Sequence, residues 1–164
     1  MPPSDRSAQI SALYQEMILD HYRKPRNKGV MENADVSVPM KNPLCGDEIT
    51  LHVRFGEDAV DELSFSGRGC SISQASASMM THLLKGKNFG DVEVLRNRFR
   101  DMVMGDDAAA QDSSLGSLRA LSGVSRFPAR VKCALLAWNA LERALEKGSV
   151  AKEIEHPEQE GAEP

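Results

Sequence analysis

The stretch ITLHVRFGEDAVDELSF (residues 49–65) decides the fold class. Apolar residues take every second position in its first half, which predicts a strand with one buried face. The tripeptide at 56–58 predicts a turn, and the apolar residues after it predict a second strand. Upstream, Val36 and Val38 alternate with polar residues and predict a third strand. The strand-forming apolar residues are Val36, Val38, Ile49, Leu51, Val53, Phe55, Val60, Leu63 and Phe65. Consecutive strands with short connections imply an antiparallel meander.

Apolar residues recur at helical spacing on both sides of these strands. A first helix is expected to begin with Ser7 as its cap and to end before Pro25. Residues 71–85 contain no glycine or proline and many small residues, which predicts a helix packed closely on the sheet. Residues 91–104 predict another amphipathic helix. Pro128 is expected in the first turn of the last helix, where proline is tolerated.

The remaining segments set the predicted domain limits. Residues 105–116 (GDDAAAQDSSLG) predict an acidic loop, followed by a short helical piece around Leu118 and Leu121. From residue 149 the chain is acidic and lacks an apolar period, which predicts a disordered acidic tail over 149–164. We therefore expect one domain over residues 1–148, of the α+β class: a small three-stranded antiparallel sheet with helices packed on one face.

Composition narrows the classes of partner and compartment. The net charge of −4 and pI of about 5.6 give no electrostatic footprint for nucleic acid or for an anionic membrane. No apolar run approaches the roughly 18 residues of a membrane span, and the N-terminus MPPSDRSAQI has no secretory apolar region. Three widely spaced cysteines do not suit a disulfide framework. Reduced thiols in a cytoplasmic protein fit better.

Three cysteines and one aspartate are the candidate site residues. Cys45 and Asp47 lie in the turn NPLCGD (residues 42–47) just before a strand, while Cys70 opens a helix, whose N-terminal dipole favours a thiolate. Cys133 lies in the last helix. No pair forms a CxxC motif, and a lone buried cysteine is usually a small hydrophobe. The residues alone therefore indicate only that a Cys/Cys/Cys/Asp cluster is possible.

Other polar residues are expected to have structural roles. His21 continues the apolar face of the first helix, so we expect it half-buried and hydrogen-bonded. His52 alternates onto the polar side of its strand and is expected to be solvated. Met79 and Met80 are expected to fill core gaps. The basic stretch at residues 23–28 is interpreted as a solvated helix end, with partner docking as the alternative.

Four segments together carry a family resemblance. LYQEMILDHYRKPRNKG (13–29), NPLCGDEITL (42–51), GRGCSISQASASMMT (67–81) and FPARVKCALLAWNAL (127–141) resemble, in family order, the SufU-type branch of the NifU/IscU-like iron–sulfur cluster assembly family. The resemblance implies a SufU/IscU-like fold. It also implies that Cys45, Asp47, Cys70 and Cys133 converge on one metal site. The IscU branch has histidine where this chain has Lys132, and a lysine is a cation at neutral pH rather than a ligand.

The resemblance to the SufU branch implies zinc at this site and sulfur supplied by a PLP-dependent, SufS-like cysteine desulfurase. The leading hypothesis is a relay by transpersulfuration, with downstream iron–sulfur scaffolds or apo-proteins as acceptors. It would act as a sulfurtransferase-like relay rather than as a multiple-turnover enzyme alone. Cys45 is the expected acceptor because its glycine-flanked loop can move. Arg130, three residues before Cys133, is placed to stabilise a persulfide anion or to offset the site's negative charge, unless it is simply a solvated surface arginine.

Three alternatives stay open at this point. The first is a scaffold that binds iron and assembles a [2Fe–2S] cluster on the same ligands, where the aspartate would leave the cluster labile. The second, a zinc hydrolase or deaminase, is disfavoured because the H-x-E and P-C-x-x-C signature is missing. The third is zinc as a structural staple, whose removal would unfold the chain.

Overall fold

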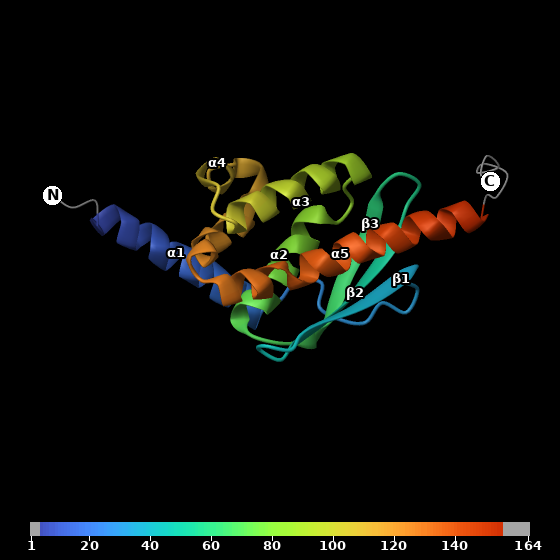
Figure 1. The fold of residues 1–164 in the computed structure, drawn as a ribbon, viewed down its shortest axis with the longest axis horizontal. Coiled ribbons are helices and arrows are strands. Elements are labelled where there is room, and N and C mark those ends of the chain that lie inside the picture. The colour runs from blue at the N-terminus through green and yellow to red at the C-terminus, as the bar shows by residue number, and fades with distance from the viewer. Residues whose placement is uncertain (1–3, 156–164) are drawn as a thin grey trace.

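The computed structural model describes residues 4–155 (Figure 1). The elements are α1 Ser4–Arg23, β1 Val36–Asn42, β2 Asp47–Phe55, β3 Val60–Arg68, α2 Ser71–Leu84, α3 Phe89–Val103, α4 Asp107–Ala110, the 3₁₀ helix η1 Ser113–Arg126 and α5 Pro128–Glu155. None of these helices combines the length and the apolar character needed to cross a membrane.

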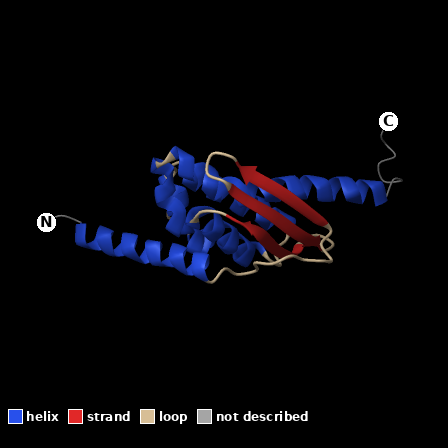
Figure 2. Ribbon diagram, turned by 90° about the horizontal axis from the view of Figure 1, so that it is seen from below, coloured by secondary structure: helices blue, strands red, loops and turns tan. Residues whose placement is uncertain are grey.

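The three strands form an antiparallel sheet in the order β1-β2-β3. Leu51 in the central strand lies opposite Val38 on one side and Phe65 on the other, and all three side chains are buried. The helices gather on one face of the sheet, as Figure 2 shows from below. The predicted α+β class and strand arrangement are therefore confirmed.

Helices α2 and α5 cross at the centre of the helical layer. Small residues make this crossing close: the Ser76 hydroxyl donates to the Ala134 carbonyl oxygen at 2.7 Å, and the Trp138 indole N–H donates to the Ser76 oxygen at 3.1 Å. Trp138 also stacks on Phe99 with ring centroids 4.5 Å apart. The small residues of α2 therefore pack closely against α5, whereas the sequence placed this close packing against the sheet. The predicted core position of the two methionines in this helix is confirmed.

Two helix boundaries and one loop differ from expectation. α1 begins at Ser4 rather than after Ser7, although it ends before Pro25 as predicted. The segment 105–116 is not a plain loop, because the side chains of Asp106 and Asp112 cap α4 and η1 by accepting backbone N–H bonds. α5 continues to Glu155, past the predicted start of the tail at residue 149. Residues 156–164 lie outside the described part of the chain, so the tail stays a prediction.

The two histidines that the sequence singled out are both buried. His21 bonds through its Nδ1 to the Ser78 hydroxyl at 2.8 Å, which confirms a satisfied histidine between α1 and α2. His52 was expected in solvent, and this expectation is wrong. Its ring lies between the hydroxyls of Ser37, at 2.8 Å, and Ser66, at 3.1 Å, and only 5% of the residue is exposed. Neighbouring strands supply both hydroxyls, so the sheet register buries a residue that alternation alone places outside.

Candidate metal centre

Three segments distant in sequence meet at one end of the sheet: the β1–β2 turn, the β3–α2 junction and the first turns of α5. Asn42 organises the first of them. Its carbonyl oxygen accepts N–H bonds from Cys45, at 3.3 Å, and Gly46, at 2.9 Å, and its side-chain oxygen accepts one from Leu44 at 3.2 Å. Gly46 has φ of +72°, a conformation that glycine adopts without strain. The turn therefore presents the Cys45 thiol at its tip.

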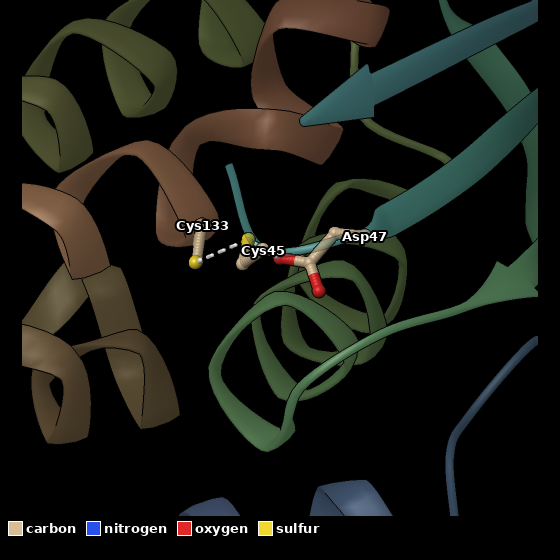
Figure 3. A group of neighbouring side chains, drawn as sticks. All are labelled: Cys45, Asp47 and Cys133. Carbon is tan, nitrogen blue, oxygen red and sulfur yellow. Dashed lines mark hydrogen bonds between the residues drawn. The ribbon is translucent and has the colours of Figure 1, made fainter. Parts of the chain in front are cut away.

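Cys45 lies between the other two members of the cluster (Figure 3). Its Sγ is 2.9 Å from Asp47 Oδ2 and 3.3 Å from Cys133 Sγ. The potential ligand atoms of these three residues all lie within 4.8 Å of one another. Cys45 is exposed, whereas Asp47 and Cys133 are buried. The exposed Cys45 thiol therefore lies next to two buried groups, the Asp47 carboxylate and the Cys133 thiol.

Cys70 joins this group through Asp47. Its backbone N–H donates to Asp47 Oδ1 at 2.8 Å, and its Sγ lies 3.6 Å from Asp47 Oδ2. The same sulfur caps α2 by accepting the N–H bond of Ser73 at 3.5 Å. It lies outside the set whose ligand atoms are all within 4.8 Å of one another. The three cysteines predicted for the metal site therefore lie around the Asp47 carboxylate. Cys45 and Cys133 form the close group with it, and Cys70 lies beside that group.

Gly69 makes room for this arrangement. A Cβ atom at that position would lie 2.5 Å from Asp47 Oδ1 and 2.6 Å from the Ser73 hydroxyl. Those separations are impossible for carbon, so only glycine lets the backbone pass this close to the carboxylate. Sequence reasoning valued the glycines for turning the chain and missed this contact. It also missed Asn42, whose amide nitrogen lies 4.0 Å from Cys133 Sγ.

The groups of the cluster perturb one another. Burial alone would raise the pKa of Asp47, but hydrogen bonds from the Cys45 thiol and the Cys70 N–H outweigh it and hold that pKa below its usual value. Desolvation of the sulfur raises the pKa of Cys45, and its hydrogen bond to Asp47 adds to the effect. Burial, followed by the hydrogen bond to Cys45, raises the pKa of Cys133 strongly. Without a cation, the cluster thus holds one carboxylate and two protonated thiols.

These donors fit a thiophilic divalent cation. Thiolates with one carboxylate are an accepted ligand set for zinc in four-coordinate sites. Among the described residues, no ion pair neutralises the fully buried Asp47. Cys45, Asp47 and Cys133 lie close enough together to hold one metal ion, and Cys70, the predicted fourth ligand, lies beside them and stays a prediction.

Two cationic residues near Cys133, Arg130 and Lys132, are exposed and do not belong to the cluster of cysteines and Asp47. Arg130 is exposed, and its guanidinium lies 5.9 Å from the centre of the Phe127 ring. Within the described part of the chain, no hydrogen bond or ion pair joins Arg130 to the cysteines or to Asp47. Lys132 is also exposed. The predicted role of Arg130 therefore stays a prediction.

Comparisons with known proteins agree on one family. A protein-family model, described as NifU-like N terminal domain, matches residues 13–153 of this chain. The chain is 48% identical over 142 residues to the zinc-dependent sulfurtransferase SufU of Bacillus subtilis, covering 86% of this chain and 95% of that protein. It is 39% identical over 147 residues to the iron–sulfur cluster assembly scaffold protein IscU of Streptococcus pyogenes, covering 90% and 91%.

Solved structures give the same result. An iron–sulfur cluster assembly scaffold protein for the SUF system from Fervidobacterium islandicum superposes with a TM-score of 0.70 at 35% identity, covering 79% of this chain and 94% of that one. A NifU-like protein (N-terminal) from Brucella abortus has a TM-score of 0.73 over 81% of this chain and 92% of that one; at 20% identity it supports the fold alone. The chain therefore belongs to the NifU-like N-terminal domain family, and its resemblance to the SufU-type branch is confirmed.

Proposed function

We propose that this member of an iron–sulfur cluster assembly family is a zinc-bound sulfur acceptor that takes sulfur from a PLP-dependent cysteine desulfurase. The observation that carries the proposal is the exposed Cys45 thiol, within 3.3 Å of one buried thiol and 2.9 Å of a buried carboxylate. A nucleophile needs access to a partner, while metal ligands need enclosure. A relative named as a zinc-dependent sulfurtransferase supports the same assignment. Reduced thiols lead us to expect a cytoplasmic protein.

The transfer step needs no oxidant. The Cys45 thiolate attacks the outer sulfur of the desulfurase persulfide, the bond to the desulfurase cysteine breaks, and that cysteine leaves as a thiolate. Cys45 then carries a persulfide. Asp47 Oδ2 is the hydrogen-bond acceptor of the Cys45 thiol, so it orients the sulfur before attack. A bound zinc ion would supply charge that keeps the thiols deprotonated. Arg130 would stabilise the persulfide anion after turning away from Phe127.

Cys45→Ser tests the acceptor assignment. The anaerobic full-length protein is incubated with the desulfurase and cysteine, and mass spectrometry locates the persulfide while zinc is measured on the same sample. We expect a persulfide on Cys45 of the wild type with about one zinc per chain, as one four-ligand site requires. The serine variant should accept no sulfur. Transfer to Cys45→Ser at the wild-type rate would refute the assignment. Arg130→Ala, with Arg126→Ala as its control, tests whether the arginine assists.

The second candidate function is a scaffold for a [2Fe–2S] cluster on the same residues. The similarity to the IscU protein of Streptococcus pyogenes favours it. Anaerobic reconstitution with iron and sulfide separates the two candidates. A stable brown chromophore that is needed for cluster delivery supports the scaffold, and a colourless, zinc-loaded active protein supports the relay.

A further inference from the structure

The sulfur atoms of Cys45 and Cys133 make a contact that simple sulfur acceptance does not use. They lie 3.3 Å apart, although 88 positions separate them in the chain. Reacting atoms in productive ground-state geometries lie about 3–3.5 Å apart. Cys70 lies outside this close group. The structure thus holds one particular thiol at reaction distance from the sulfur that would carry the persulfide.

We propose that Cys133 is a resolving thiol, which attacks a persulfide on Cys45 and releases its outer sulfur as sulfide. The proposal rests on the proposed function for the source of that persulfide. It assigns Cys133 a catalytic role beyond metal binding. It also makes sulfide, rather than only a persulfide, a product of this protein.

The step balances without an external oxidant. The Cys133 sulfur forms a bond to Cys45 Sγ, the sulfur–sulfur bond of the persulfide breaks, and the outer sulfur leaves with the bonding pair. In formula, Cys45–S–S⁻ and Cys133–SH give a Cys45–S–S–Cys133 disulfide and HS⁻, so the thiol proton departs with the sulfide. The outer sulfur is reduced by two electrons, and the two cysteine sulfurs are oxidised. A cellular dithiol must then reduce the disulfide before another round.

The burial of the two residues sets the direction of the reaction. Exchange at a sulfur atom needs the attacking and leaving groups on opposite sides of it. Cys133 is 5% exposed and approaches Cys45 from the protein side, whereas Cys45 and its neighbour Leu44 face solvent. The outer sulfur of a Cys45 persulfide can therefore point outward while Cys133 attacks from below. The Asn42 amide, 4.0 Å from Cys133 Sγ, keeps that sulfur near the turn.

Attack on the outer sulfur is the competing reaction. It would move the persulfide to Cys133 and release nothing. The inner sulfur is the atom that the structure holds 3.3 Å from Cys133, which favours release. The resulting disulfide removes two of the four ligands proposed for the metal, so sulfide release should also expel a bound zinc ion.

The test uses the full-length protein, prepared anaerobically and loaded in two ways, by the desulfurase with cysteine and by inorganic polysulfide, each followed by desalting. Sulfide is measured without added thiol, and non-reducing peptide mapping locates disulfides. In the wild type we expect one sulfide for each Cys45–Cys133 disulfide, with zinc release reported by a chromogenic chelator. Cys133→Ser should keep its persulfide on Cys45 and release sulfide at least about tenfold more slowly. Arg126→Ala, which changes an exposed residue outside the cysteine cluster, should still form the disulfide and release sulfide.

Equal sulfide release from wild type and Cys133→Ser would overturn the proposal, as would a wild-type map with the persulfide persisting and no disulfide. The mapping needs no variant, so misfolding of Cys133→Ser cannot hide the result. The two loading routes separate the two claims. Failure of the desulfurase to load Cys45, with disulfide and sulfide still formed after polysulfide, would refute the proposed function and leave the resolving role of Cys133 supported.

Discussion

The α2–α5 crossing and the cysteine end of the sheet both bury polar groups, but only the cysteine end also buries a carboxylate. At the crossing, the Ser76 hydroxyl donates to a carbonyl oxygen and accepts from Trp138, so its hydrogen bonds are satisfied within the chain. At the cysteine end, the buried Asp47 lies beside the thiols of Cys45 and Cys70 and has no ion-pair partner among the described residues. The hydrogen bonds at the crossing contribute stability, whereas a buried carboxylate that is grouped with thiols and has no cationic partner suits a bound cation.

Truncation at the crossing should give the largest loss of stability. Trp138 is 1% exposed and stacks on Phe99, so Trp138→Ala removes packing and leaves the Ser76 oxygen without its indole donor. We expect a loss of about 3–5 kcal/mol in the free energy of unfolding, measured by urea titration with a chelator present. Asn139→Ala, on the same helix but half-buried, should change it by less than about 1 kcal/mol. A small effect of Trp138→Ala would mean that the crossing is not the stabilising region.

Asp47→Asn is expected to lower the affinity for zinc without lowering the stability of the metal-free protein. Losing this ligand should weaken zinc binding by at least about 100-fold, since even outer-shell changes cost 10–100-fold. In metal-free protein the variant should unfold at nearly the same urea concentration as the wild type. It loses a charge-assisted bond to the Cys70 N–H but no longer buries an unpaired carboxylate. Competition with a chromogenic chelator measures affinity. A severe loss of metal-free stability would make Asp47 structural.

The histidine between α1 and α2 should make the helical layer sensitive to acid. Burial, followed by the nearby Arg26 cation, lowers the pKa of His21 to about 4 from its usual 6.5. The unfolded chain binds this proton more readily than the folded one. The free energy of unfolding is therefore unaffected by His21 well above pH 6.5, and it decreases as the pH falls from 6.5 toward 4. Between pH 7 and pH 5 the wild type should lose about 2 kcal/mol more than His21→Gln. An equal loss of stability in the wild type and in His21→Gln would mean that another group causes the acid sensitivity.

The sequence predicted this fold well where a residue's role depends on its immediate neighbours. Period-two alternation located the strands, and Pro128 marked the start of α5 because its fixed backbone suits a first turn. Alternation failed at His52, because its burial depends on which hydroxyls the adjacent strands bring beside it. The predicted helical piece around Leu118 and Leu121 is confirmed as part of η1. The four-residue α4 is too short for a detectable period, and its Asp106 cap marks its start.

The candidate site was less accessible to local reasoning than the fold. Cys45 and Asp47 are two positions apart and could be paired from the turn motif. Cys133 comes 88 positions later, and only tertiary packing brings its sulfur to Cys45. Resemblance to a family supplied that contact in advance, but it did not indicate that one thiol would be buried and the other exposed. That difference distinguishes a nucleophile from a resolving partner.

The smallest expected effect compares two glycines with the same strain. Gly46 at the cysteine turn and Gly86 after α2 have φ of +72° and +85°, and a Cβ atom on either would meet nothing within 4 Å. Alanine at each position should therefore cost about 1 kcal/mol in the free energy of unfolding, from backbone strain alone. Only Gly46→Ala should also change the rate at which Cys45 reacts with a small alkylating agent, because only that turn sets the position of a thiol. Equal alkylation rates in both variants would mean that the Cys45 turn adapts without moving its sulfur, and that its glycine serves folding rather than reactivity.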